Sequence, residues 1–90
     1  MSITVNIHKS WRQYTGGRAE VAVTGKTVGA CLDDLVRQFP EIKKEIFDEK
    51  GTVLNVVEIY VNDESAWPDE LAKKVSDGDE IYMTVKLAGG

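Results

Sequence analysis

The 90-residue sequence predicts one α+β domain: a mixed sheet of four to five strands with one main helix and a short second helix packed on one face. Two observations predict this class. Apolar and polar residues alternate in runs near both ends and in the middle of the chain, which is typical of half-buried strands. Between the second and third of these runs, apolar residues recur with the period of a helix. We therefore expect helices gathered on one face of a sheet.

The N-terminal segment predicts a strand hairpin. Apolar residues alternate with polar ones over residues 3–7, which indicates a first strand with one buried face. A connection over residues 9–17 ends in Gly16 and Gly17, which adopt positive φ at little cost and can reverse the chain. A second alternating run covers residues 19–23. We expect these two strands to pair.

The main helix is predicted to begin after Thr27, a residue type that caps helix N-termini well. It is predicted to end before Pro40, because the residue that precedes a proline is disfavoured in the α region. One apolar stripe on this helix consists of Val28, Leu32, Leu35, Val36 and Phe39. A second, short helical segment over residues 41–48 is expected to bury Ile42 and Ile46.

The C-terminal half predicts two more strands and a very short third element. Alternating runs cover residues 57–61 and 81–87, and turn-forming residues occupy positions 62–63 and 77–79. Residues 64–76 are mixed in character and leave room for a very short strand. Their expected apolar anchors are Trp67, Leu71 and Val75.

The order of these elements narrows the topology. The right-handed crossover rule favours a fold in which the first and last strands lie side by side. A helix that crosses between two hairpins on one side of a mixed sheet is the β-grasp arrangement of ubiquitin-like proteins. We expect a single β-grasp domain over residues 1–87 and a flexible tail over residues 88–90 that ends in two glycines.

Composition excludes several classes of function. Eleven basic against fifteen acidic residues give a net charge of −4, which disfavours nucleic acid and anionic membrane surfaces as partners. A single cysteine and a single histidine exclude an internal disulfide, a CxxC redox pair and a His-rich zinc site. We expect no bound metal or cofactor, and no membrane span or signal peptide. The chain is expected to be cytoplasmic, and monomeric when free.

The C-terminal end is where the residues point to chemistry. Two residues without Cβ can enter a narrow channel in a partner, where side chains would clash. A carboxylate lacks a good leaving group, but a partner enzyme with ATP can convert the Gly90 carboxylate into an acyl-adenylate. Attack by a persulfide and reductive cleavage then leave a nucleophilic thiocarboxylate. Gly90 is the candidate reactive residue, and the candidate partner contacts beside it are Gly89, Ala88, Leu87 and Lys86.

Other single residues have simpler interpretations. Tyr60 and Tyr82 fall on the predicted outward face of the sheet and form a candidate partner-binding surface. Cys31 lies beside the apolar stripe and is expected to be an inert core residue. His8 is expected at the surface without a metal-binding role, while Trp11 fits either an interface or packing over the end of the core.

Over essentially its whole length, the sequence resembles the ThiS/MoaD family of sulfur-carrier proteins. The motifs that carry the resemblance are Tyr14-Thr15-Gly16-Gly17, Thr27-Val28-Gly29, Tyr60-Val61-Asn62-Asp63-Glu64, Asp77-Gly78-Asp79-Glu80 and Ala88-Gly89-Gly90. Within the family, the sequence is most similar to the cysteine-biosynthesis branch, the CysO type. It departs from the family where a proline often precedes the tail, because the run there is Thr84-Val85-Lys86-Leu87 and contains no proline. We interpret Lys86 as a contact for an acidic groove of a partner.

The resemblance implies a protein co-substrate, not an enzyme. A ubiquitin-activating-type enzyme would use ATP to adenylate Gly90, and Gly90 would then be thiolated. A sulfur-accepting synthase would take the sulfur; in the cysteine branch this is a cysteine synthase that acts on an activated serine. Two alternatives remain open. One is the small subunit of molybdopterin synthase, and the other is a ubiquitin-like module that binds partners or is conjugated to lysines.

Overall fold

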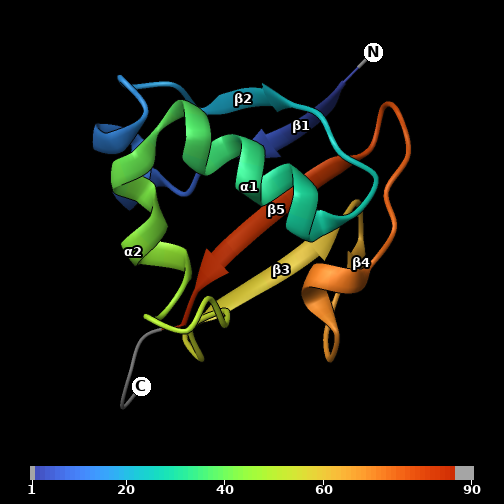
Figure 1. Ribbon diagram of the computed structural model, residues 1–90. Helices are drawn as coiled ribbons and strands as arrows, with labels where there is room; N and C mark the ends of the chain where they lie inside the picture. The colour runs from blue at the N-terminus through green and yellow to red at the C-terminus, as the bar shows by residue number, and fades with distance from the viewer. Residues whose placement is uncertain (1, 87–90) are drawn as a thin grey trace.

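The computed structural model describes residues 2–86, which contain five strands of one mixed sheet, two α-helices and three short 3-10 helices (Figure 1). The strands are β1 (Ile3–Asn6), β2 (Glu20–Val23), β3 (Val57–Val61), β4 (Glu64–Ser65) and β5 (Glu80–Val85). The helices are α1 (Val28–Gln38) and α2 (Lys43–Ile46), together with the 3-10 helices η1 (Lys9–Tyr14), η2 (Pro40–Ile42) and η3 (Glu70–Ala72). These bounds confirm the predicted strands, the main helix and the short second helix.

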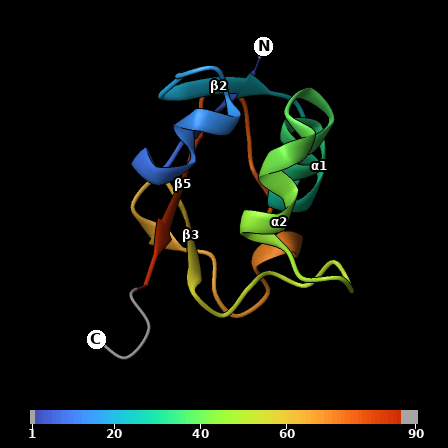
Figure 2. The same cartoon turned by 90° about the vertical axis from the view of Figure 1, so that its left-hand side faces the viewer.

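The sheet has the order β2-β1-β5-β3-β4. β5 runs parallel to β1, with Val5 opposite Ile81, and the other neighbouring strands are antiparallel. The predicted hairpin and the predicted contact between the first and last strands are both confirmed. Figure 2 shows α1 and α2 together on one side of the sheet, so within residues 2–86 the other face carries no α-helix, and we call it the helix-free face. This is a β-grasp arrangement, as expected from the element order.

The core lies between the sheet and the helices. On β1, β3 and β5 every second residue is buried, which is the pattern that the alternation predicted. Cys31 is fully buried beside Leu32 and Leu35, so its assignment to the core is confirmed. Trp11 is 3% exposed and belongs to the same core, so of its two interpretations the packing role holds.

The ends of α1 follow from local chemistry. The Thr27 hydroxyl oxygen accepts a hydrogen bond from the Ala30 N–H at 3.1 Å, which confirms the predicted N-cap. At the other end the Phe39 N–H donates to the Leu35 carbonyl, and Pro40 begins η2 instead of continuing the helix. The helix therefore ends at Gln38, where the proline rule places its end.

The loop before β2 is more regular than predicted. The connection expected over residues 9–17 contains η1, and Gly16 and Gly17 then adopt φ values of 64° and 86°. Both values lie in the left-handed region that favours glycine. The hydroxyl of the buried Thr15 donates to the Arg18 carbonyl at 2.9 Å and closes the turn. The Thr-Gly-Gly motif is thus accounted for as a turn that returns the chain to β2.

One predicted anchor is wrong. Trp67 is 75% exposed, whereas the neighbouring Ala66 is buried. The two-residue turn after β3 starts β4 at Glu64, and the Ala66 N–H pairs with the Ile59 carbonyl at 2.9 Å. Because side chains alternate along an extended segment, Ala66 points inward and Trp67 points outward. The other two anchors hold, since Val75 is buried and Leu71 packs against the core.

Candidate functional site

β5 leads the chain from the centre of the sheet to the predicted reactive tail. It lies between β1 and β3, and the Lys86 N–H donates to the Val56 carbonyl at 2.7 Å just beyond its end. This hydrogen bond continues the ladder to the last residue that the structure describes. The predicted reactive residue and its neighbours lie outside the described residues: Leu87, Ala88, Gly89 and Gly90. The structure therefore defines the base of the tail.

Two tyrosines mark the helix-free face of the sheet. Tyr60 on β3 and Tyr82 on β5 are directly opposite each other in the antiparallel register. Both alternate with buried residues, so both side chains project from the face away from the helices, as predicted. Tyr82 is 39% exposed and Tyr60 is half-buried. Their role in partner binding stays a prediction.

A carboxylate lies at the centre of this face. The Tyr82 hydroxyl donates to Oε1 of Glu80 at 3.1 Å, and Nδ2 of Asn6 donates to the same oxygen at 3.1 Å. The hydrogen bond and the negative charge of Glu80 raise the pKa of Tyr82, with smaller contributions from Asp63 and Glu20. Tyr82 is therefore an uncharged phenol in an acidic surrounding at neutral pH. Sequence reasoning missed Asn6 and Glu80, because only the parallel β1–β5 register brings them together.

The helix-free face is acidic as a whole. Glu20 on β2, Glu58 on β3 and Glu80 on β5 all occupy positions that alternate with buried residues. They extend across the sheet around the tyrosine pair, in a chain whose net charge is −4. Such a surface complements a basic partner surface and speeds the encounter with it.

Two of the sequence motifs meet at the far end of β5. Nδ2 of Asn62 donates to Oδ1 of Asp79 at 3.1 Å, and the Glu80 N–H donates to Oδ1 of Asn62 at 3.1 Å. The Ser76 N–H donates to the other oxygen of Asp79 at 2.8 Å. These hydrogen bonds, first the one from Ser76 and then the one from Asn62, lower the pKa of Asp79. The two motifs therefore join the turn after β3 to the turn before β5, at the end of β5 away from Lys86.

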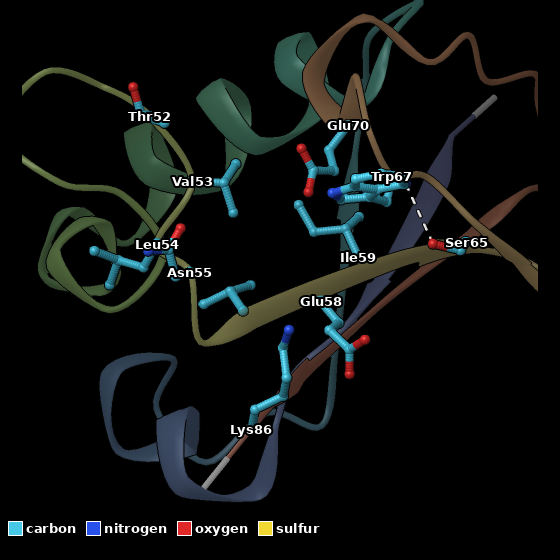
Figure 3. Close-up of a pocket in the computed structure, with 11 residues that line it drawn as sticks. Thr52, Val53, Leu54, Asn55, Glu58, Ile59, Ser65, Trp67, Glu70 and Lys86 are labelled. Carbon is cyan, nitrogen blue, oxygen red and sulfur yellow. Dashed lines mark hydrogen bonds between the residues drawn. The ribbon is translucent and has the colours of Figure 1, made fainter. Parts of the chain in front are cut away.

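Lys86 borders an open hollow of about 420 Å³ at the edge of the sheet (Figure 3). In this view the ammonium of Lys86 points into the hollow, the carboxylate of Glu70 reaches it from the opposite side, and the indole of Trp67 forms part of the wall. The full lining is Thr52, Val53, Leu54, Asn55, Val57, Glu58, Ile59, Ser65, Trp67, Glu70 and Lys86. Sequence reasoning missed this site, because two of its walls come from loops without a periodic pattern.

The remaining candidates have structural roles. Burial, and to a smaller extent the charge of Asp34, raise the pKa of the Cys31 thiol, which disfavours the thiolate. Nδ1 of His8 accepts the Ser10 N–H at 3.1 Å and caps η1. Within residues 2–86, no three potential metal ligands form a group, and no helix is long and apolar enough to cross a membrane.

Comparison with known proteins gives a consistent result. Residues 5–90 match the ThiS family, so the match extends through the terminal glycines. The sulfur carrier protein CysO of Mycobacterium tuberculosis is 36% identical over 93 aligned residues, which cover 100% of both chains. A chain in the crystal structure of the Amycolatopsis orientalis BexX/CysO complex has a TM-score of 0.88 and 32% identity, over 98% of this chain and 99% of that chain. SAMP1 of Haloferax volcanii has a TM-score of 0.85 and 25% identity over the full length of both chains.

Proposed function

Because this chain belongs to the ThiS family, we propose that it is a sulfur carrier of cysteine biosynthesis whose Gly90 carboxylate receives and delivers the sulfur. The observation that carries the proposal is the full-length similarity to a sulfur carrier protein, CysO, with 36% identity over an alignment that covers 100% of both chains. The base of the proposed reactive tail fits this role, since Lys86 is hydrogen-bonded to Val56 just beyond the end of the central strand β5.

The proposed chemistry takes place in partner enzymes. A ubiquitin-activating-type enzyme joins the Gly90 carboxylate to AMP from ATP and releases pyrophosphate. A persulfide then attacks the Gly90 carbonyl carbon and displaces AMP, which leaves an acyl disulfide. Reduction of its S–S bond by a thiol releases a thiocarboxylate, and this anionic sulfur is the nucleophile that is delivered. The carrier is a co-substrate, and ATP is bound by the partner.

The helix-free face is the proposed docking surface for the activating enzyme. Tyr82 and Tyr60 provide an aromatic centre, and carboxylates such as Glu80 surround it. Interfaces with this composition concentrate binding energy in the aromatic residues and gain association rate from the charges. The face leads along β5 toward Lys86, so an enzyme that binds it lies next to the start of the tail.

Mass analysis of the C-terminal peptide tests the proposal. After incubation with the activating enzyme, ATP and a sulfur donor, the C-terminal peptide is expected to gain about 16 Da. Methionine oxidation gives the same nominal shift, so the C-terminal peptide must be isolated or its thiocarboxylate alkylated before the measurement. Removal of Gly90 should abolish the gain while far-UV circular dichroism stays unchanged. A gain of the same size in the truncated protein would contradict the assignment.

Similarity to a protein modifier favours a second candidate function. SAMP1, named small archaeal modifier protein 1, shares the fold with a TM-score of 0.85 and 25% identity. If an amine replaces the persulfide as the attacking nucleophile, the same acyl-adenylate gives an amide with a lysine of another protein. Ladders of higher mass that carry the Gly90 peptide on target lysines would favour this role, and their absence beside a thiocarboxylate would favour the carrier.

A further inference from the structure

The hollow beside Lys86 adjoins the face assigned to the activating enzyme, and Glu58 borders both. It lies along β3 at the edge of the sheet, where β4 pairs only with Tyr60 and Val61. In the described part of the chain, the rest of β3 therefore has no strand on that side. The core residues Val57 and Ile59 line the hollow there.

Trp67 gives this hollow the character of a binding site. Its indole is 75% exposed, and it faces the half-buried Val53 across the hollow (Figure 3). An exposed tryptophan costs free energy in water, and tryptophan is the residue type most enriched among the side chains that dominate interfaces. The backbone N–H of Trp67 donates to Oγ of Ser65 at 3.2 Å, which fixes the backbone that carries the indole.

Three charged side chains line the hollow, Lys86, Glu58 and Glu70, and none of them forms an ion pair within the described part of the chain. The ammonium of Lys86 and the carboxylate of Glu70 enter from opposite sides. Glu70 is half-buried and adjoins the Trp67 indole. A ligand that satisfies this surface carries a cation at the Trp67 end and an anion at the Lys86 end.

We infer that the hollow docks an extended segment of the sulfur-accepting enzyme, with an arginine stacked on Trp67 and bonded to Glu70 and an acidic residue beside Lys86. This inference rests on the proposed function. A guanidinium is the cation that both stacks on an indole and pairs with a carboxylate, so it fits the Trp67 end better than an ammonium.

The reach of the tail supports an enzyme as the occupant. The four residues after Lys86 span at most about 14 Å when fully extended. Any enzyme that reacts with Gly90 must therefore bring its surface close to Lys86, which borders the hollow. The activating enzyme is assigned to the acidic sheet face, and the hollow leaves the accepting enzyme a second surface at the same base.

Two assays on the same variants separate these surfaces. Trp67→Ala and Glu70→Lys are expected to form the thiocarboxylate at a rate within about twofold of wild type. Their kcat/KM for sulfur transfer, measured with the organism's own cysteine synthase and an activated serine, is expected to fall at least about tenfold, the effect of losing a dominant interface residue. Trp67→Phe, which keeps an aromatic ring, should retain most of the wild-type kcat/KM for sulfur transfer. Lys86→Glu should impair transfer in the same direction.

Matched controls use exposed residues at the other end of β5. Asp77→Asn and Lys26→Ala change charge without touching the hollow, and both should leave both assays unchanged. Thermal unfolding checks that each variant is folded. If Trp67→Ala does not fold, Glu70→Lys still tests the inference. Unchanged transfer by folded Trp67→Ala and Glu70→Lys, or a loss of activation in place of transfer, would overturn the inference. Failure of the wild-type protein to form a thiocarboxylate would instead overturn the proposed function.

Discussion

At the residue scale, Glu80 determines the chemistry of the helix-free face. Its carboxylate accepts hydrogen bonds from Tyr82 and Asn6, two residues on different strands. The shared acceptor orients the phenol and gives the face its charge. A partner that docks here meets a fixed donor–acceptor pair, and substitutions of Glu80 should change that pair without disturbing the core behind it.

The titration of Tyr82 tests this pair. Because the Glu80 hydrogen bond and charge raise the pKa of Tyr82, its ring is expected to titrate above the value of about 10 for an exposed tyrosine. The stabilisation that this hydrogen bond provides is present below the unfolded-state pKa and is lost as the pH rises through the folded-state pKa. Glu80→Gln should lower the pKa of Tyr82, as followed by NMR of the labelled ring. An unchanged titration in Glu80→Gln would show that Glu80 is not the cause.

The contribution of Asp79 to stability has the opposite pH dependence to that of Tyr82: it is lost as the pH falls. Hydrogen bonds from Ser76 and Asn62 lower the pKa of Asp79 in the folded state. The stabilisation that Asp79 provides is therefore present above the unfolded-state pKa of about 3.9, and it is lost as the pH falls through the lower folded-state pKa. Asp79→Asn should lower the free energy of unfolding at neutral pH, and the difference from wild type should shrink in acid. Urea unfolding measures both, with Asp77→Asn in the same turn as the control. Equal pH dependence of Asp79→Asn and wild type would contradict this role.

At the scale of elements, α1 protects the edge of the sheet. The Thr24 N–H, just after β2, donates to Oδ2 of Asp34 at 3.0 Å, and Nε2 of Gln38 donates to the Ala22 carbonyl at 3.1 Å. Arg37 holds the other oxygen of Asp34 at 3.0 Å. Side chains of the helix thus occupy backbone groups that an exposed edge strand would offer to another chain.

Loss of this cover should be measurable. Asp34→Ala removes the acceptor for the Thr24 N–H and is expected to lower the free energy of unfolding by about 1–2 kcal/mol. The control is Asp33→Ala, an exposed neighbour on the same helix, which makes the same gain in helix propensity. Urea denaturation compares the two. Equal free energies of unfolding would contradict the protective role of Asp34.

Local patterns predicted the elements because their causes are local. Alternation placed β1, β3 and β5, and the Thr27 cap and Pro40 bounded α1. The error at Trp67 arose where no period exists, since a two-residue turn decides which of two adjacent side chains points inward. Helix η1 was missed for a similar reason, because a short 3-10 helix leaves no repeating apolar stripe.

At the scale of the whole molecule, the surfaces around the tail depend on long-range pairing. The parallel register of β1 and β5 joins Asn6 to Glu80, and the hollow brings two separate loops to Lys86. No local pattern encodes such contacts, so the sequence predicted the outward positions of Tyr60 and Tyr82 but neither the Asn6–Glu80 contact nor the hollow. In the proposed function, the sheet holds the base of the tail through the Lys86–Val56 hydrogen bond, and two adjoining surfaces serve two enzymes.

Isotope transfer tests the central claim most directly. The carrier is loaded at Gly90 with sulfur-34 by the activating enzyme, purified, and mixed with the cysteine synthase and an activated serine. After acid hydrolysis, the newly formed cysteine should carry the label in a one-to-one ratio to the loaded carrier. Cysteine without the label, while the heavy sulfur remains as sulfide or on the tail, would contradict the account.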